Sequence, residues 1–193
     1  MGASGAGAAG LKEHGRRAVF LDRDGVLNRA IEKEGRPYPP TSLSALAFLS
    51  DARDSVTRLR HAGFITICVT NQPDVARGSL NAKDAKAINT FTVQSLGLDD
   101  LISCFHDDAD ACRCRKPKPG MLFKGSERWS IDLNRSYLIG DRWRDIDAGA
   151  TAGCRTILID RGWKERQPTH EPHSRVTSTT DAVNWIFSDS RKV

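Results

Sequence analysis

Two carboxylates, two positions apart, follow an apolar run near the start of the chain. Asp22 and Asp24 come directly after residues 18–21, whose composition is typical of a buried strand. One carboxylate of such a pair can attack phosphorus, while the other protonates the leaving oxygen and then activates water. An Asp-x-Asp pair alone also occurs in turns and helix caps, so the chemistry depends on what the rest of the chain supplies.

Three further polar clusters follow in order along the chain, each close behind an apolar run. They are Thr70-Asn71-Gln72, Arg115-Lys116, and the stretch from Asp141 to Asp145. Strands of an open parallel sheet end at one edge, so we expect all four clusters to meet there. Phosphoryl transfer needs positioning and positive charge around the phosphoryl oxygens, and these residue types provide both.

Three of the acidic residues predict a metal ion. Asp22, Asp141 and Asp145 would repel one another at a shared edge unless a cation lay between them. Hard carboxylate oxygens with retained waters suit Mg²⁺. The sequence therefore predicts a magnesium site, with Asp145 either bound to the ion or supporting its neighbours.

A second metal signature precedes Lys116. Cys104 and His106, followed by Cys112 and Cys114, offer three thiolates and one imidazole, which is a tetrahedral Zn²⁺ set. Four protein ligands leave no position for water, so this zinc would be structural and would stiffen a loop with few large apolar residues. The alternative is a buried Cys104 beside two incidental, redox-active cysteines.

The order of the four motifs resembles that of the haloacid dehalogenase superfamily of phosphotransferases, over roughly residues 17–160. By this resemblance, Asp22 is the nucleophile that forms an aspartyl phosphate, and Asp24 is the general acid and base. Thr70 hydrogen-bonds a phosphoryl oxygen and Lys116 neutralises its charge. Mg²⁺ is held by Asp22, by the backbone carbonyl of Asp24 and by Asp141.

The zinc loop placed directly before Arg-Lys-Pro-Lys-Pro-Gly-Met resembles one branch of that superfamily. This branch contains the D-glycero-D-manno-heptose 1,7-bisphosphate phosphatases and the histidinol-phosphate phosphatases. The resemblance implies five substrate-binding residues: Asn28, Asn71, Gln72, Arg115 and Arg142. Two features depart from the heptose pattern: Pro73 stands where a small Ser is common, and the zinc loop is short, as in the histidinol-phosphate enzymes.

We therefore expect a Mg²⁺-dependent phosphatase acting on a small phosphorylated metabolite, with heptose 1,7-bisphosphate as the leading substrate. Histidinol phosphate is the alternative substrate. A catalytically silent binding module is the alternative of a different class, although every charged residue that the chemistry needs is present.

The elements that must position these residues alternate along the chain, which predicts a Rossmann-like three-layer α/β/α fold with a central parallel sheet and no large cap domain. Strands are expected near 17–22, 64–69, 101–105, 136–140 and 155–159, and helices near 42–61, 81–96, 119–130, 145–153 and 179–188. Residues 162–178 are polar and are predicted to be a loop, with His170 and His173 solvated and without partners.

Size and charge fit this interpretation. The 193 residues suit one domain, expected over residues 16–193, after a Gly- and Ala-rich flexible tail at 1–15. The formal charge of +5 is scattered along the chain, which favours a small anionic substrate over nucleic acid. With no apolar run long enough to cross a bilayer, we expect a cytoplasmic protein without membrane contact, either a monomer or a weak homodimer.

Overall fold

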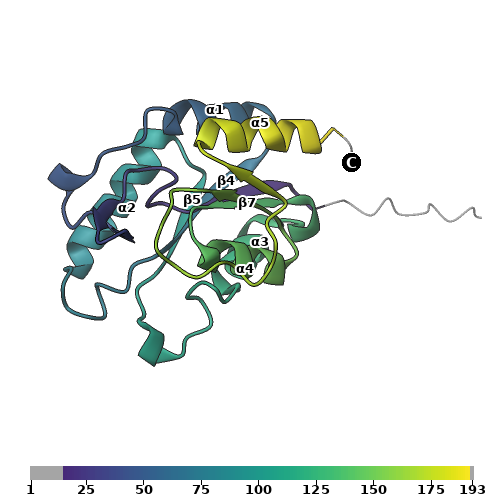
Figure 1. The fold of residues 1–193 in the computed structure, drawn as a ribbon. Coiled ribbons are helices and arrows are strands. Elements are labelled where there is room, and N and C mark those ends of the chain that lie inside the picture. The colour runs from purple at the N-terminus through teal and green to yellow at the C-terminus, as the bar shows by residue number, and fades with distance from the viewer. Residues whose placement is uncertain (1–14, 192–193) are drawn as a thin grey trace, which may run out of the picture.

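The computed structural model describes residues 15–191 and places a six-stranded parallel sheet between two layers of helices (Figure 1). The strand order is β5-β4-β1-β6-β7-β8, so β1 lies in the interior and carries Asp22 at its carboxyl end. This confirms the predicted fold class. The strands are β1 (Ala18–Leu21), β4 (Ile65–Asn71), β5 (Asp100–Cys104), β6 (Tyr137–Gly140), β7 (Arg155–Ile159) and β8 (Ser174–Val176).

Alternating side chains of the sheet form two hydrophobic cores. Val19 and Leu21 face α1 and α5, whereas Ala18 and Phe20 face α3 and α4, as expected for a strand buried on both sides. Figure 1 shows α1 and α5 above the sheet and α3 and α4 below it. The helices are α1 (Ala52–His61), α2 (Ala82–Leu96), α3 (Gly120–Trp129), α4 (Trp143–Ala152) and α5 (Thr179–Asp189), with short 3₁₀ turns η1 (Leu43–Ala45), η2 (Asp108–Asp110) and η3 (Leu133–Arg135).

The prediction of a helix over 42–61 was wrong for its first half. Only η1 forms there, and α1 begins at Ala52. Arg29 N–H donates to the carbonyl of Ala47 at 2.8 Å, and Leu49 N–H donates to the carbonyl of Leu27 at 3.0 Å. These bonds hold the segment extended beside the Asp-x-Asp loop, where a helix would have no room.

A small hairpin takes the place of a cap domain among the described residues. Strands β2 (Ile31–Lys33) and β3 (Arg36–Tyr38) pair antiparallel. Glu34 and Gly35 join them with φ values of 54° and 79°, as a tight hairpin turn requires. The hairpin rests on a distant loop, because Lys164 N–H donates to the carbonyl of Gly35 at 2.8 Å.

The interpretation of residues 162–178 as a partnerless loop was wrong in two respects. Strand β8 forms within it and pairs parallel to β7. Both histidines have partners: His170 Nδ1 lies 3.2 Å from Asp147 Oδ1, and His173 Nδ1 accepts a hydrogen bond from Thr156 N–H at 3.1 Å. Strand β8 was not predicted because it is short and polar and lies at the sheet edge, where apolar patterning is weak.

Residues 1–14 of the expected tail lie outside the described residues. Gly15 is packed, since a Cβ at that position would lie 2.9 Å from the backbone nitrogen of Asp132. Within residues 15–191, no helix combines the length and the apolar character that crossing a membrane demands.

Candidate active site

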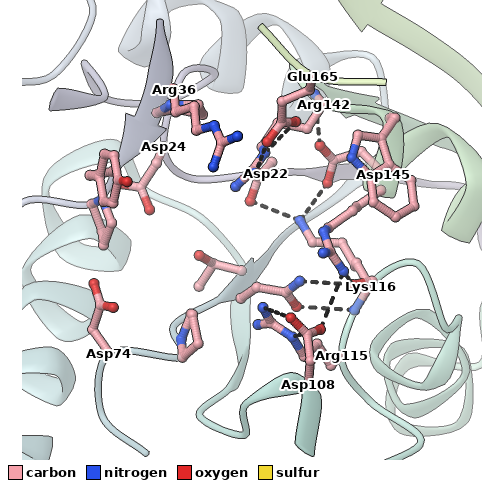
Figure 2. Close-up of a pocket in the computed structure, with 18 of the residues that line it drawn as sticks. Asp22, Asp24, Arg36, Asp74, Asp108, Arg115, Lys116, Arg142, Asp145 and Glu165 are labelled. Atoms are coloured by element: carbon pink, nitrogen blue, oxygen red, sulfur yellow. Dashed lines mark hydrogen bonds and ion pairs between the residues drawn. The ribbon is translucent and has the colours of Figure 1, made fainter. Parts of the chain in front are cut away.

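The carboxyl ends of β1, β4 and β6, together with the loop after β5, bring the four sequence motifs into one cavity of about 590 Å³. Asp22, Thr70, Lys116 and Asp145 all line it, although they are far apart in the sequence. Figure 2 shows Lys116 reaching between Asp22 and Asp145, with arginines around them. The predicted convergence of the motifs on one sheet edge is therefore what the structure has.

Lys116 is the electrostatic centre of the cavity floor. Its Nζ lies 2.8 Å from Asp22 Oδ1 and 2.6 Å from Asp145 Oδ1, and it donates to the carbonyl of Val69 at 2.7 Å. The side chain is only 2 % exposed. Burial alone would lower the pKa of Lys116, but Asp145 and Asp22 raise it above its ordinary value, so the ammonium stays charged.

The acidic residues hold more negative charge than one lysine balances. Burial is the largest influence on Asp22 and raises its pKa to about 6; Lys116 opposes the shift, and Asp145 and Asp24 add to it. The pKa of Asp141 is also well above its ordinary value, because the side chain is buried and lies near Asp22 and Asp145. Carboxylates gathered in this way are stable in their ionised form only with a further cation.

The donor set fits a magnesium ion. Ligand oxygens of Asp22, Asp141 and Asp145 lie within 4.8 Å of one another. Asp141 Oδ1 is buried and has no hydrogen-bond partner among the described residues, while its Oδ2 accepts from the indole Nε1 of Trp163 at 2.7 Å. A buried carboxylate oxygen without a donor is costly, and a hard cation would satisfy it.

Two glycines leave space for these carboxylates. A Cβ at Gly25 would lie 1.9 Å from Asp141 Oδ2, and a Cβ at Gly140 would lie 2.1 Å from Asp145 Cβ. Gly25 also has a φ of 89°, which favours glycine. Its carbonyl accepts two hydrogen bonds from Arg161, at 3.0 Å from Nε and 2.9 Å from Nη2, so the residue after β7 fixes the turn after β1.

Asp24 lies in the same cavity but is held by different partners. Arg23 donates to its carboxylate through Nη2 at 3.0 Å, Asn28 Nδ2 donates at 2.9 Å, and Gln72 Nε2 donates at 3.0 Å. Gln72 also bonds Thr70 Oγ1 at 2.8 Å. This network fixes the second carboxylate of the pair relative to Thr70 near the carboxyl end of β4.

The five predicted substrate-binding residues divide into two groups. Asn28 and Gln72 are fully buried and hold Asp24, and neither lines the cavity. Asn71, Arg115 and Arg142 do line it. Asn71 clamps the backbone of Lys116 with two hydrogen bonds of 3.0 Å, and Arg142 Nε donates to Glu165 at 3.0 Å.

The predicted zinc ligands form a compact cluster beside the cavity. Sulfur atoms of Cys104, Cys112 and Cys114 lie 3.2–3.7 Å apart, and His106 Nδ1 lies 3.5 Å from Cys104 and 3.3 Å from Cys114. A tetrahedral ion with ~2.3 Å bonds to sulfur separates its ligands by roughly 3.8 Å. The donor types and their spacing fit Zn²⁺.

Several residues of the site were not predicted from the sequence. Arg23 is fully buried between the two aspartates and bonds Asn89 of α2 at 2.8 Å. Trp163, Arg144 and Asp108 reach the site from loops or from the start of a helix. Sequence patterns do not show where such loops run. Of these residues, only Arg23 could have been predicted from the sequence, because a charged residue inside an otherwise buried motif needs a partner.

Comparisons with known proteins show which family the chain resembles. A HAD-hydrolase-like family model matches residues 113–185. The D-glycero-alpha-D-manno-heptose-1,7-bisphosphate 7-phosphatase of Photorhabdus laumondii is 31% identical over 92% of this chain and 96% of its own. The D-glycero-beta-D-manno-heptose-1,7-bisphosphate 7-phosphatase of Rhodopseudomonas palustris is 33% identical over 72% of this chain and 80% of its own.

A solved structure is similar over the whole fold. The D,D-heptose 1,7-bisphosphate phosphatase from B. bronchiseptica, complexed with magnesium and phosphate, superposes with a TM-score of 0.73 at 26% identity, covering 90% of this chain and 99% of that one.

Proposed function

Because this chain belongs to the heptose-1,7-bisphosphate 7-phosphatase family of haloacid dehalogenase-like phosphoric monoester hydrolases, we propose that it removes one phosphate from D-glycero-D-manno-heptose 1,7-bisphosphate. The observation that carries the proposal is the contact of Lys116 Nζ with both Asp22 and Asp145 at the end of the central strand. It places a buried positive charge beside a buried nucleophile, at the point where a phosphoryl group would bind.

We propose that Asp22 attacks the phosphorus atom while Asp24 donates a proton to the departing sugar oxygen. The P–O bond to the sugar breaks as the bond to the carboxylate oxygen of Asp22 forms, which leaves an aspartyl phosphate. Asp24, now ionised, takes a proton from water, and that water attacks phosphorus. The P–O bond to Asp22 breaks, which releases inorganic phosphate and restores the Asp22 carboxylate. Arg23, Asn28 and Gln72 keep the Asp24 carboxylate in place for both steps.

Lys116 and Thr70 would hold the phosphoryl oxygens, where negative charge accumulates. Asp145 orients Lys116 through the 2.6 Å contact. When bound, Mg²⁺ would supply charge neutralisation and orient the phosphoryl group. Asp22, Asp141 and the backbone carbonyl of Asp24 would hold the ion, and Asp145 would act mainly by supporting Lys116. Magnesium in the similar B. bronchiseptica complex supports this choice of metal.

We propose zinc for the cluster of Cys104, His106, Cys112 and Cys114, on its donor set and spacing. The described cysteines are all free thiols. Such a site is compatible with a reducing compartment, so we propose a cytoplasmic location.

The decisive experiment measures phosphate release, with Mg²⁺ present, from both anomers of heptose 1,7-bisphosphate, from hexose bisphosphates and from histidinol phosphate. Both anomers belong in the panel because the two relatives named above differ in anomer. We expect the highest kcat/KM with one heptose bisphosphate. Activity confined to histidinol phosphate would transfer the assignment to that substrate, and a protein without turnover on any of them would contradict the proposal.

A further inference from the structure

The rim of the cavity carries an excess of positive charge. Of the residues that line the cavity, eight are Arg or Lys and six are Asp or Glu. Some rim arginines pair with a carboxylate that is itself well buried, as Arg166 does with the 8 % exposed Asp147. Arg115 and Arg144 differ, because both bond the carboxylate of one exposed residue, Asp108.

The geometry around Asp108 is that of an anion between two guanidinium groups. Arg115 Nε lies 2.8 Å from Asp108 Oδ1, and Arg144 Nη1 lies 3.4 Å from the same oxygen. Arg115 is only 10 % exposed, whereas the side chain of Asp108 is 59 % exposed. Figure 2 shows Asp108 against Arg115 at the edge of the cavity opposite Asp22. A buried guanidinium is thus satisfied by a carboxylate that extends into solvent.

The loop that presents Asp108 is anchored through other residues. Asp107 accepts from Arg77 at 2.6 and 2.9 Å, and its own backbone N–H donates to Asp110 at 2.6 Å. These bonds fix the turn η2 without using the side chain of Asp108. The Asp108 carboxylate can therefore leave the arginines by side-chain rotation while the turn remains in place.

The arginine pair adjoins the catalytic floor. Arg144 Nη1 lies 3.5 Å from the backbone carbonyl of Lys116. The side chain of the same lysine extends to Asp22, which its Nζ contacts. One lysine side chain therefore separates the arginines from the nucleophile. Guanidinium groups bind phosphate through paired N–H donors, and they match it better than ammonium groups do.

We propose that Arg115 and Arg144 form a clamp for the phosphate of the sugar bisphosphate that is not hydrolysed, and that Asp108 is a substitute anion which this phosphate displaces. The clamp presupposes the proposed function, since only a bisphosphate carries a second phosphate into the cavity. The sequence already predicts that Arg115 binds the substrate. The proposal adds Arg144 as a second phosphate ligand and Asp108 as the anion that the phosphate displaces.

Displacement of Asp108 makes the site selective. A dianionic phosphate recovers two guanidinium partners when it displaces the carboxylate, whereas the neutral end of a monophosphate recovers none. The same competition weakens binding of the bisphosphate, because only the fraction of molecules with the clamp open can accept it. Removing the charge of Asp108 should therefore improve binding, which is unusual for a residue that lines an active site.

The test compares Asp108→Asn and Arg144→Gln with the wild type, using inhibition of p-nitrophenyl phosphate hydrolysis by glucose 1,6-bisphosphate and by glucose 6-phosphate. We expect Asp108→Asn to strengthen inhibition by the bisphosphate by about threefold or more. Arg144→Gln should weaken inhibition by the bisphosphate by about tenfold or more. Inhibition by the monophosphate should change less, so the preference for the bisphosphate should fall. Arg144→Lys, which keeps the charge, should give an intermediate value.

Matched controls are Asp54→Asn and Arg53→Gln, which change the same charges on the exposed side of α1. Weaker bisphosphate inhibition in Asp108→Asn, or equal changes for both inhibitors in Arg144→Gln, would overturn the clamp. So would a wild type that binds the bisphosphate no better than the monophosphate. A wild type that hydrolyses p-nitrophenyl phosphate but not heptose bisphosphate would refute only the proposed substrate, since the inhibition constants still judge the clamp.

Discussion

The floor and the rim of the cavity are built on different principles. On the floor, Asp22 follows β1, Lys116 lies on the loop after β5 and Asp145 lies in the first turn of α4; all three are buried, and Lys116 contacts both carboxylates directly. On the rim, Arg36, Arg144 and other cations stand on loops, a hairpin and a helix start, and are partly exposed. The chemical step needs charged groups that are fixed and shielded from water, whereas substrate recognition tolerates charged side chains that can move. Changes to the floor should therefore abolish turnover, and changes to the rim should alter substrate preference.

Asp22→Asn should have the largest effect. The amide keeps the size of the side chain but cannot attack phosphorus, so we expect kcat to fall by about 1,000-fold or more. Circular dichroism should show an unchanged fold. Asp54→Asn, on the surface of α1, serves as the control and should retain full activity. Substantial turnover by Asp22→Asn would place the nucleophile elsewhere and would remove the contrast between floor and rim.

Lys116→Met should damage both activity and stability. It leaves two buried carboxylates without their partner, which costs about 3 kcal/mol of unfolding free energy. It also removes the charge beside the phosphoryl group, and we expect kcat to fall about 100-fold. Urea unfolding and steady-state kinetics measure the two effects. Loss of activity without loss of stability would mean that the carboxylates relax into solvent.

Removal of the proposed zinc ligands tests how far the rim depends on the loop that carries them. Cys112→Ser with Cys114→Ser should abolish zinc binding, measured by native mass spectrometry as loss of one Zn²⁺ per chain. Since this loop carries Arg115 and Asp108, we expect kcat/KM for a bisphosphate to fall about tenfold. Arg113→Gln lies between the two cysteines, is exposed in the wild type, and should change neither value. A wild type purified without chelator and free of zinc would refute the structural metal.

The smallest effect should come from the hairpin. Gly35→Ala places a Cβ 2.7 Å from Lys164 at a φ of 79°, whereas Gly63→Ala meets no atom within 4 Å at a φ of 82°. Both variants should lose about 1 kcal/mol of stability from backbone strain. Only Gly35→Ala should also raise KM, by about two- to threefold, because it disturbs the hairpin that carries Arg36. Equal kinetics for the two variants would show that the hairpin does not contribute to binding.

The same division explains what the sequence could reveal. Asp22, Thr70 and Asp141 lie at the carboxyl ends of apolar strands, and Lys116 lies on the loop after β5. Parallel strands end at one edge, so the meeting of these residues could be deduced. Arg144 and Asp108 face each other only because η2 and the start of α4 approach in space. Loop courses depend on individual contacts, which neither periodicity nor composition records.

Two of the secondary-structure predictions were wrong for a related reason. The segment before α1 looks helical, yet backbone bonds to Leu27 and Arg29 hold it extended. Strand β8 is too short and polar to be recognised, although its pairing with β7 defines it. In both places a tertiary contact outweighs local preference.

The bonds from Arg161 to the carbonyl of Gly25 join two segments that are 136 positions apart. On the ribosome, the turn that carries the nucleophile emerges long before the residue that fixes it. A nascent chain halted before residue 161 therefore lacks these two bonds and also β8. Assembly of the catalytic turn is completed only after Arg161 has been translated, so products truncated before this residue should be inert toward phosphorylated metabolites.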